Sequence, residues 1–299
     1  MIQVPRVRED WEAITRRMEA ERRRMLGEVL GIVAVSAILL WVTQRFPLSV
    51  AWDAFLGEMA SLNLYLAAGI WYALRFRRDA LWVAGVTYLG LALITVVSNY
   101  LTKAGLPMPF PEGVLMAGTR LYGGIVMMGV WLILALLMRR YPDEVRNLGL
   151  NFVAPGQMVL YGLLGAAVIA AHLIFTSTYS GALTFEPKPL PYMVWHLFYE
   201  LGLQSSAEEI FFRGVVFNYL YNWRGQGFWG AAIASSALNV LLYVPKAQWT
   251  ASPEIAVGAI FYVFIAGMIY AGLYRWFRSL LPSYVCNVTV SLISTFRGL

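Results

Sequence analysis

Imidazole and thiol groups are scarce in this chain of 299 residues, which contains two histidines, His172 and His196, and one cysteine, Cys286. One cysteine excludes an internal disulfide and any site built on a Cys-x-x-Cys pair. Two histidines leave little for an imidazole-based metal centre or for axial ligation of several haems or pigments. The sequence also has no P-loop, H-E-x-x-H or G-x-S-x-G pattern. It therefore gives no support to the familiar zinc and serine hydrolases.

Charged residues are also rare, at 13% of the chain, whereas hydrophobic residues make up 59%. Soluble proteins carry about 25% charged residues. With a mean hydropathy of +0.61, the composition predicts an integral membrane protein. Apolar stretches long enough to cross a membrane, at about 20 residues per crossing, lie at 28–46, 54–74, 80–101, 120–138, 157–177, 190–221, 228–245, 255–277 and 280–296. We predict an all-α fold, a polytopic transmembrane helical bundle of about eight or nine spans, in which the polar last stretch either crosses or is re-entrant.

The formal net charge of +6 does not indicate nucleic-acid binding, because the basic residues gather at the ends of apolar stretches. They occupy alternate loops counted from a basic N-terminal head, which is the distribution of cytoplasmic anchors. We therefore predict a multi-pass protein of a bacterial plasma (inner) membrane, surrounded by lipids, with its N-terminus in the cytoplasm. The clusters are Arg75, Arg77 and Arg78; Arg139, Arg140 and Arg146; Arg224; and Arg275 and Arg278.

The chain divides into three parts by composition. Residues 1–27 read as a cytoplasmic amphipathic helix, with Glu12 and Arg16 paired four residues apart. This helix either anchors the chain or lies on the membrane surface or on a partner subunit. Residues 28–150 form a half of four spans, and residues 151–299 contain every motif discussed below.

Two adjacent carboxylates and a guanidinium lie within the longest apolar stretch, at Glu208, Glu209 and Arg213. A charge at the centre of a membrane costs roughly 2.5–3.5 kcal/mol on insertion scales, so these groups need one another, a cavity or a function. On a helix Glu209 and Arg213 share one face, where they neutralise each other. Glu208 points about 100 degrees away from that face. An acid left without a cation in apolar surroundings is suited to act as a general base.

The pattern Glu208-Glu209-x-x-x-Arg213, followed by Gly214, resembles the first motif of the CAAX-protease and bacteriocin-processing (CPBP, or Abi) family. The resemblance covers about residues 155–299. It implies a multi-spanning membrane protein, and in proteolytic members an intramembrane endopeptidase. In such members a motif glutamate and two histidines on later helices activate water, by a glutamate or a metal mechanism.

The sequence departs from the family pattern at both of these histidines. The expected Phe-x-x-x-His pair falls on Asn239 and Tyr243. The expected His-x-x-x-Asn pair, which follows a proline, falls on Asn287 and Ser291. Asn, Tyr and Ser side chains satisfy a buried glutamate by hydrogen bonding, but they neither shuttle a proton near neutral pH nor bind zinc as imidazole does.

We therefore favour a non-catalytic (pseudo-protease) subunit without a cofactor. In this interpretation the motif positions form a structural network that ties three helices together, and the protein binds, assembles or protects another integral membrane protein or complex. The residues of this network are Glu208, Glu209, Arg213, Asn239, Tyr243 and Asn287, and the remaining motif position is Ser291.

The alternative is an active CAAX-type endopeptidase in which Glu208 is the general base, alone or with another histidine, and Arg213 and Asn239 support it. Zinc is expected only in this alternative. His196 is the obvious substitute, because it lies four residues before Glu200 on the helix that leads into the motif. Gly202 predicts a bend between Glu200 and Glu208. The competing interpretation is that His196 and Glu200 satisfy each other.

Two further ionisable residues belong to predicted spans. His172 reads as a hydrogen-bonded interior or interface side chain rather than a ligand, and Glu58 as the partner of a polar neighbour. A third interpretation makes the protein a transporter with Glu58 or Glu208 as proton carrier, although the two halves show none of the repeats that transporters usually contain.

Overall fold

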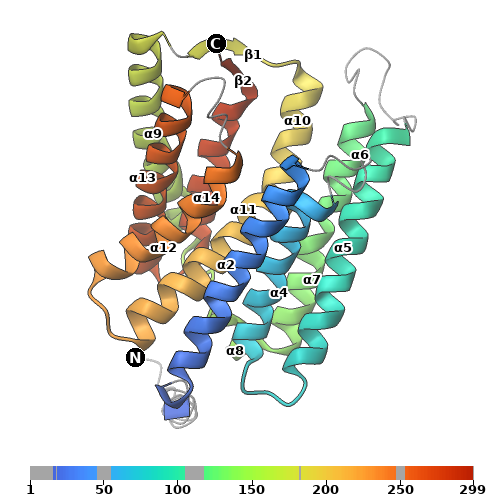
Figure 1. The fold of residues 1–299 in the computed structure, drawn as a ribbon, viewed down its shortest axis with the longest axis vertical. Helices are drawn as coiled ribbons and strands as arrows, with labels where there is room; N and C mark the ends of the chain where they lie inside the picture. Colours follow the sequence, from blue (N-terminus) through green and yellow to red (C-terminus); the bar gives the residue numbers. More distant parts are fainter. Residues whose placement is uncertain are drawn as a thin grey trace.

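The computed structural model describes residues 16–17, 19–45, 55–104, 118–181, 183–246 and 253–298. Within these ranges the protein is a bundle of long helices (Figure 1). Five helices are long and apolar enough to cross a membrane: Arg22–Thr43, Ala80–Leu101, Tyr122–Arg140, Pro155–Ser180 and Pro253–Phe277. The expected polytopic helical membrane bundle is therefore confirmed. Most of the predicted helix 1–27, including Glu12, lies outside the described residues.

The first half of the bundle is built around one buried helix. Its elements are α2 (Arg22–Arg45), the segment η1 (Phe55–Met59), which is kinked at Gly57, α4 (Ala60–Leu74), α5 (Ala80–Ala104), α6 (Gly118–Met127), α7 (Gly129–Arg140) and the short α8 (Pro142–Arg146). Most residues of α4 are buried, whereas α5 exposes large apolar side chains such as Leu81, Leu89 and Leu93. A helix that is apolar on all sides is stable only when other helices or lipid surround it.

The second half contains α9 (Pro155–Ser180), α12 (Phe228–Tyr243), η5 (Val244–Lys246), α13 (Pro253–Phe277), α14 (Leu280–Ser291) and η6 (Leu292–Thr295). One departure from an all-helical fold is a short antiparallel pair, β1 (Leu183–Pro187) with β2 (Phe296–Gly298). Helix α14 is capped by Ser279, whose hydroxyl accepts a hydrogen bond from the Leu281 amide. The helix packs against α9 so closely that a side chain at Gly162 would meet the Pro282 carbonyl oxygen at 2.6 Å.

One continuous helical segment contains the acidic pair. It comprises α10 (Leu190–Tyr199), η2 (Glu200–Gln204), α11 (Ser205–Glu208), η3 (Glu209–Phe217) and η4 (Tyr219–Trp223). At 1.5 Å per residue such a helix is about 50 Å long, more than the roughly 30 Å of a hydrocarbon core. Figure 1 shows it running obliquely across the bundle, which accommodates the length.

At Gly202, where a bend is predicted, the helix widens, and wide turns are among the features that kink helices. The backbone keeps helical dihedral angles on both sides, and the turn η2 has π-helical hydrogen bonding. The wide turn leaves the Leu201 carbonyl accessible, and it accepts hydrogen bonds from Trp131 Nε1 and the Tyr284 hydroxyl, each at 2.6 Å. Glycine is required because a Cβ at Gly202 would lie 2.7 Å from the Met127 carbonyl carbon. Single wide turns of this kind often occur at functional sites.

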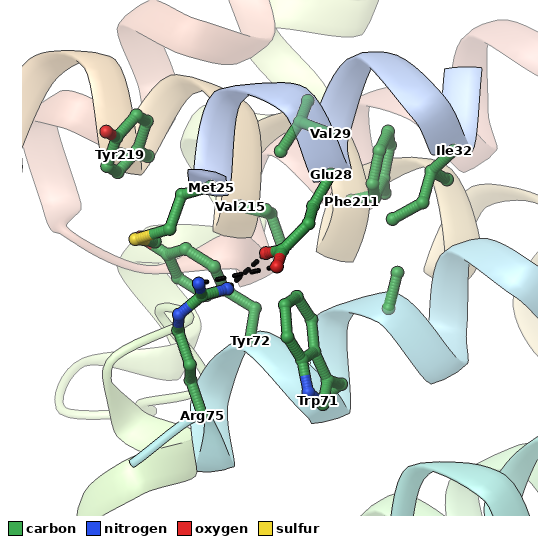
Figure 2. Close-up of a pocket in the computed structure, with 11 residues that line it drawn as sticks. Met25, Glu28, Val29, Ile32, Trp71, Tyr72, Arg75, Phe211, Val215 and Tyr219 are labelled. Atoms are coloured by element: carbon green, nitrogen blue, oxygen red, sulfur yellow. Dashed lines mark hydrogen bonds and ion pairs between the residues drawn. The ribbon is translucent and has the colours of Figure 1, made fainter. Parts of the chain in front are cut away.

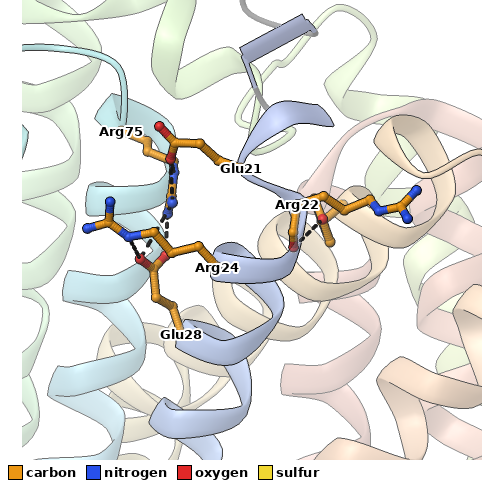
Figure 3. Close-up of polar contacts among 6 residues, drawn as sticks. Glu21, Arg22, Arg24, Glu28 and Arg75 are labelled. Carbon is orange, nitrogen blue, oxygen red and sulfur yellow. Dashed lines mark hydrogen bonds and ion pairs between the residues drawn. The ribbon is translucent and has the colours of Figure 1, made fainter.

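An arginine at the end of α4 fixes the beginning of α2. Arg75 binds Glu21 Oε2 through Nη2 at 2.8 Å and also pairs with Glu28 (Figure 3). Its side chain is 5% exposed, and its guanidinium stacks over the Trp71 ring at 4.6 Å. The Glu28–Arg75 pair lies at the edge of a small apolar pocket between α2, α4 and η3, lined by side chains that include Phe211 (Figure 2).

Candidate functional site

The two adjacent acids lie near the middle of the oblique helix and face the interior of the bundle. Glu208 is 5% exposed, and Glu209 and Arg213 are each 1% exposed. Arg213 Nη1 lies 3.2 Å from Glu209 Oε1, and its guanidinium lies over the Tyr270 ring of α13 at 4.8 Å. The guanidinium charge is therefore directed to Glu209 and to an aromatic face.

The Glu208 carboxylate accepts hydrogen bonds from three neutral side chains on three helical segments. Gln204 Nε2 donates to Oε1 at 2.6 Å, and the Tyr243 hydroxyl donates to the same oxygen at 2.8 Å. Asn287 Nδ2 lies 3.3 Å from Glu208 Oε2 and 3.1 Å from Glu209 Oε1. One amide of α14 thus bridges the two acids, and a phenol of α12 holds the first of them.

The remaining two motif positions lie at the edge of this network. Ser291 donates to Asn287 Oδ1 at 3.4 Å, which helps orient the bridging amide. Asn239 lines a small pocket with Glu208 and Tyr243, but its side-chain oxygen Oδ1 is buried and makes no hydrogen bond to any described residue. The fold therefore gathers all seven motif positions around the acid pair, with Asn239 at its side.

The other ionisable candidates occupy different surroundings. His196 Nε2 lies 3.5 Å from Glu200 Oε1 and 3.1 Å from the Ser291 carbonyl oxygen. His172 is exposed on α9 and bonds the Tyr262 hydroxyl at 2.8 Å through Nδ1. Glu58 of η1 lines the pocket that contains Glu208. The first half of the chain therefore contributes to the surroundings of the site.

Three contacts of the site were missed by the sequence reasoning. Gln204 lies four residues before Glu208, so helical spacing alone could have identified it as a donor. Tyr199 in turn donates to Gln204 Oε1 at 2.5 Å and fixes which end of the amide faces the acid. The third contact, Tyr270 over Arg213, has no sequence signal, because it depends on how α13 packs against η3.

The glycines that follow η4 match a nucleotide-binding pattern in sequence but not in structural context. Gly225, Gly227 and Gly230 match the letters G-x-G-x-x-G of dinucleotide-binding turns. That motif requires a preceding strand, but here the glycines follow the helical turn η4 and lead into α12. Gly225 has a φ of +63°, which identifies the segment as a tight link between two helices.

The side chains that contact Glu208 are Gln204, Tyr243 and Asn287. They do not fit a zinc centre, which was expected only if the protein were an active endopeptidase. Structural and catalytic zinc sites use three or four Cys, His, Asp or Glu ligands. Among the described residues no group of three or more such side chains has an arrangement that could bind a metal. The amide and phenol groups that reach Glu208 are not typical zinc ligands.

A comparison with family models matches the part of the chain that contains the motif positions. Residues 189–293 match the family model described as type II CAAX prenyl endopeptidase Rce1-like. These residues form a CPBP core. The core begins at the start of the oblique helix and contains all seven motif positions, whereas Glu58 and the Arg75 cluster lie outside it. No curated protein and no solved structure matches the chain. The boundary expected near residue 151 stays a prediction.

Proposed function

We propose that this CPBP-type integral membrane protein is a pseudo-protease that binds, assembles or protects another integral membrane protein or complex. The observation that supports the proposal is the environment of Glu208, whose carboxylate accepts hydrogen bonds from Gln204, Tyr243 and Asn287. In this proposal the chain is multi-pass in a bacterial plasma membrane, with its N-terminus in the cytoplasm.

The chemistry of peptide hydrolysis explains why these donors matter. A general base must accept a proton from water and then return it to the leaving amine, which requires a group that titrates near the working pH. The side chains at the two histidine positions are a phenol, with an ordinary pKa of about 10, and an amide that does not titrate. Tyr243 and Asn287 therefore stabilise Glu208 without relaying its proton.

The same contacts suit a structural role. Side chains from α12, α14 and the oblique helix meet at one buried acid pair, and a satisfied polar network of this kind specifies how helices pack. Outside the CPBP core, helices such as α5 and α9 expose large apolar side chains. Such faces suit contact with lipid or with another membrane protein.

Peptidase activity provides the first test. The purified chain in liposomes is incubated with a membrane-anchored CAAX-type peptide, beside the Glu208→Gln variant. We expect equal, background cleavage from both proteins. Cleavage that disappears in Glu208→Gln would support the alternative, an active endopeptidase with Glu208 as general base.

Association provides the second test. We expect a tagged chain, solubilised from its native membrane, to co-migrate in near-stoichiometric amounts with one membrane protein or complex. Glu208→Gln should leave this association intact, because Gln keeps most of the hydrogen-bonding capacity of the site. A chain that is recovered alone under mild solubilisation argues against the binding role.

A further inference from the structure

A pocket beside Glu208 is lined by side chains from both halves of the chain, both apolar, such as Leu40, Leu62 and Leu242, and oxygen-bearing. Its space accommodates about one water-sized particle. The lining side chains that contain oxygen are Glu58, Ser61, Tyr65, Glu208, Asn239 and Tyr243. The first three lie outside the CPBP core, so this pocket is formed only when the two halves pack together.

Asn239 offers this pocket an acceptor. The residue is 4% exposed, and its Oδ1 atom makes no hydrogen bond among the described residues. A buried carbonyl oxygen without a donor or a cation is destabilising, so groups of this kind usually have a ligand or an ordered solvent molecule. The Tyr243 hydroxyl, which lines the same pocket, already donates to Glu208. The Tyr65 hydroxyl, also in the lining, makes no hydrogen bond among the described residues.

Two acidic residues, Glu58 and Glu208, line this pocket. All three hydrogen-bond donors to Glu208 are neutral side chains, and the guanidinium of Arg213 pairs with Glu209 instead. None of the described residues that line the pocket is basic. A carboxylate within a membrane bundle is stable when a positive charge lies close to it.

We propose that this pocket binds one small monovalent cation of the size of sodium, held by the Glu208 carboxylate and Asn239 Oδ1. Only oxygen atoms are available as ligands, which favours a hard cation. The space is too small for Mg²⁺ with the waters it retains. The proposal is independent of whether the protein cleaves peptides.

The test is thermal unfolding of the purified full chain in detergent, followed by tryptophan fluorescence. NaCl replaces choline chloride at constant ionic strength, so that only the identity of the cation changes. We expect Tm to rise saturably, by about 3 °C or more, since a ligand that binds only the folded state stabilises it. Broadening of the ²³Na resonance by the protein provides a direct reading of binding.

Substitutions of Asn239 test whether its side-chain oxygen binds the cation or whether the side chain only fills space. Asn239→Leu should weaken the apparent sodium affinity at least tenfold, whereas Asn239→Asp, which keeps an oxygen, should retain or strengthen it. Glu254→Gln, at an exposed acid near the start of α13, is the matched control and should behave as wild type. A Tm that does not depend on sodium, or an equal dependence in Asn239→Leu, overturns the proposal.

Discussion

The Tyr243 hydroxyl donates a 2.8 Å hydrogen bond to Glu208 Oε1 from the position where the family pattern places a histidine. A phenol there fills the space of an imidazole and keeps the acid satisfied, while the capacity to relay a proton near neutral pH is absent. The contact links the first motif of the oblique helix to α12.

Replacing Tyr243 with phenylalanine should destabilise the fold. The change removes one donor from a buried carboxylate and should cost about 1–3 kcal/mol, the usual effect of stranding a buried acceptor. Thermal unfolding in detergent measures the loss. Tyr179→Phe, at an exposed tyrosine of α9, is the matched control and should be neutral. Equal stability of the two variants would contradict the role given to the phenol.

Restoring both imidazoles should restore chemistry if the family geometry is retained. The variant with Tyr243→His and Asn287→His regains a group that transfers protons near neutral pH, an effect worth about 10²–10⁴-fold in rate. Cleavage of a membrane-anchored peptide by the purified variant measures it. Adding Glu208→Gln to the same variant should abolish the gained activity. A folded double variant that stays at background shows that the spacing alone does not position the groups.

Removing the buried guanidinium should damage folding more than any other single change in the site. Arg213→Ala leaves Glu209 buried without its cation, a loss of about 3–5 kcal/mol. The yield of monodisperse protein and its thermal stability measure the effect, with Arg139→Ala at an exposed position of α7 as control. Combining Arg213→Met with Glu209→Gln should recover much of the stability, because no unpaired charge remains. Wild-type stability of Arg213→Ala would be incompatible with this account.

The cluster at the beginning of α2 should be sensitive to salt. Arg75 pairs with Glu21 and Glu28, but the Glu21 side chain is 42% exposed, so screening reduces the contribution of that pair. Arg75→Ala should cost about 1–2 kcal/mol in low salt. Repeating the measurement in 0.5 M KCl should narrow its difference from wild type, while Arg78→Ala, an exposed neighbour, changes little. A salt-independent loss would assign the effect to the packing of Arg75 on Trp71.

Stability at low pH should depend on a contact between the α4–α5 loop and the end of α7. The Tyr141 hydroxyl donates to Asp79, and this hydrogen bond lowers the pKa of Asp79 below its usual 3.8. A lowered pKa stabilises the fold above that usual value, and the contribution is lost as the pH falls through the pKa of the folded state. Tyr141→Phe should therefore show a shallower fall in Tm below about pH 4. Identical pH profiles would contradict this assignment.

Helical spacing in the sequence was sufficient to anticipate the contact between Glu209 and Arg213, because residues four apart meet on any helix. The same spacing would have revealed Gln204 beside Glu208. It did not reveal the wide turns of the oblique helix, since π-helical hydrogen bonding there is accompanied by packing of Gly202 on Met127 and by donors from Trp131. Those neighbours are far apart in the chain.

Composition and the lengths of its apolar stretches were enough to establish that this chain is a helical membrane bundle, because a backbone in lipid must satisfy its hydrogen bonds within each helix. The sequence likewise established that Tyr243 and Asn287 replace the two histidines of the family pattern. Only the tertiary structure decided that Tyr243 and Asn287 reach Glu208 and that Glu58 lines its pocket. Contacts between distant segments depend on how helices tilt and pack, and no local pattern encodes those angles.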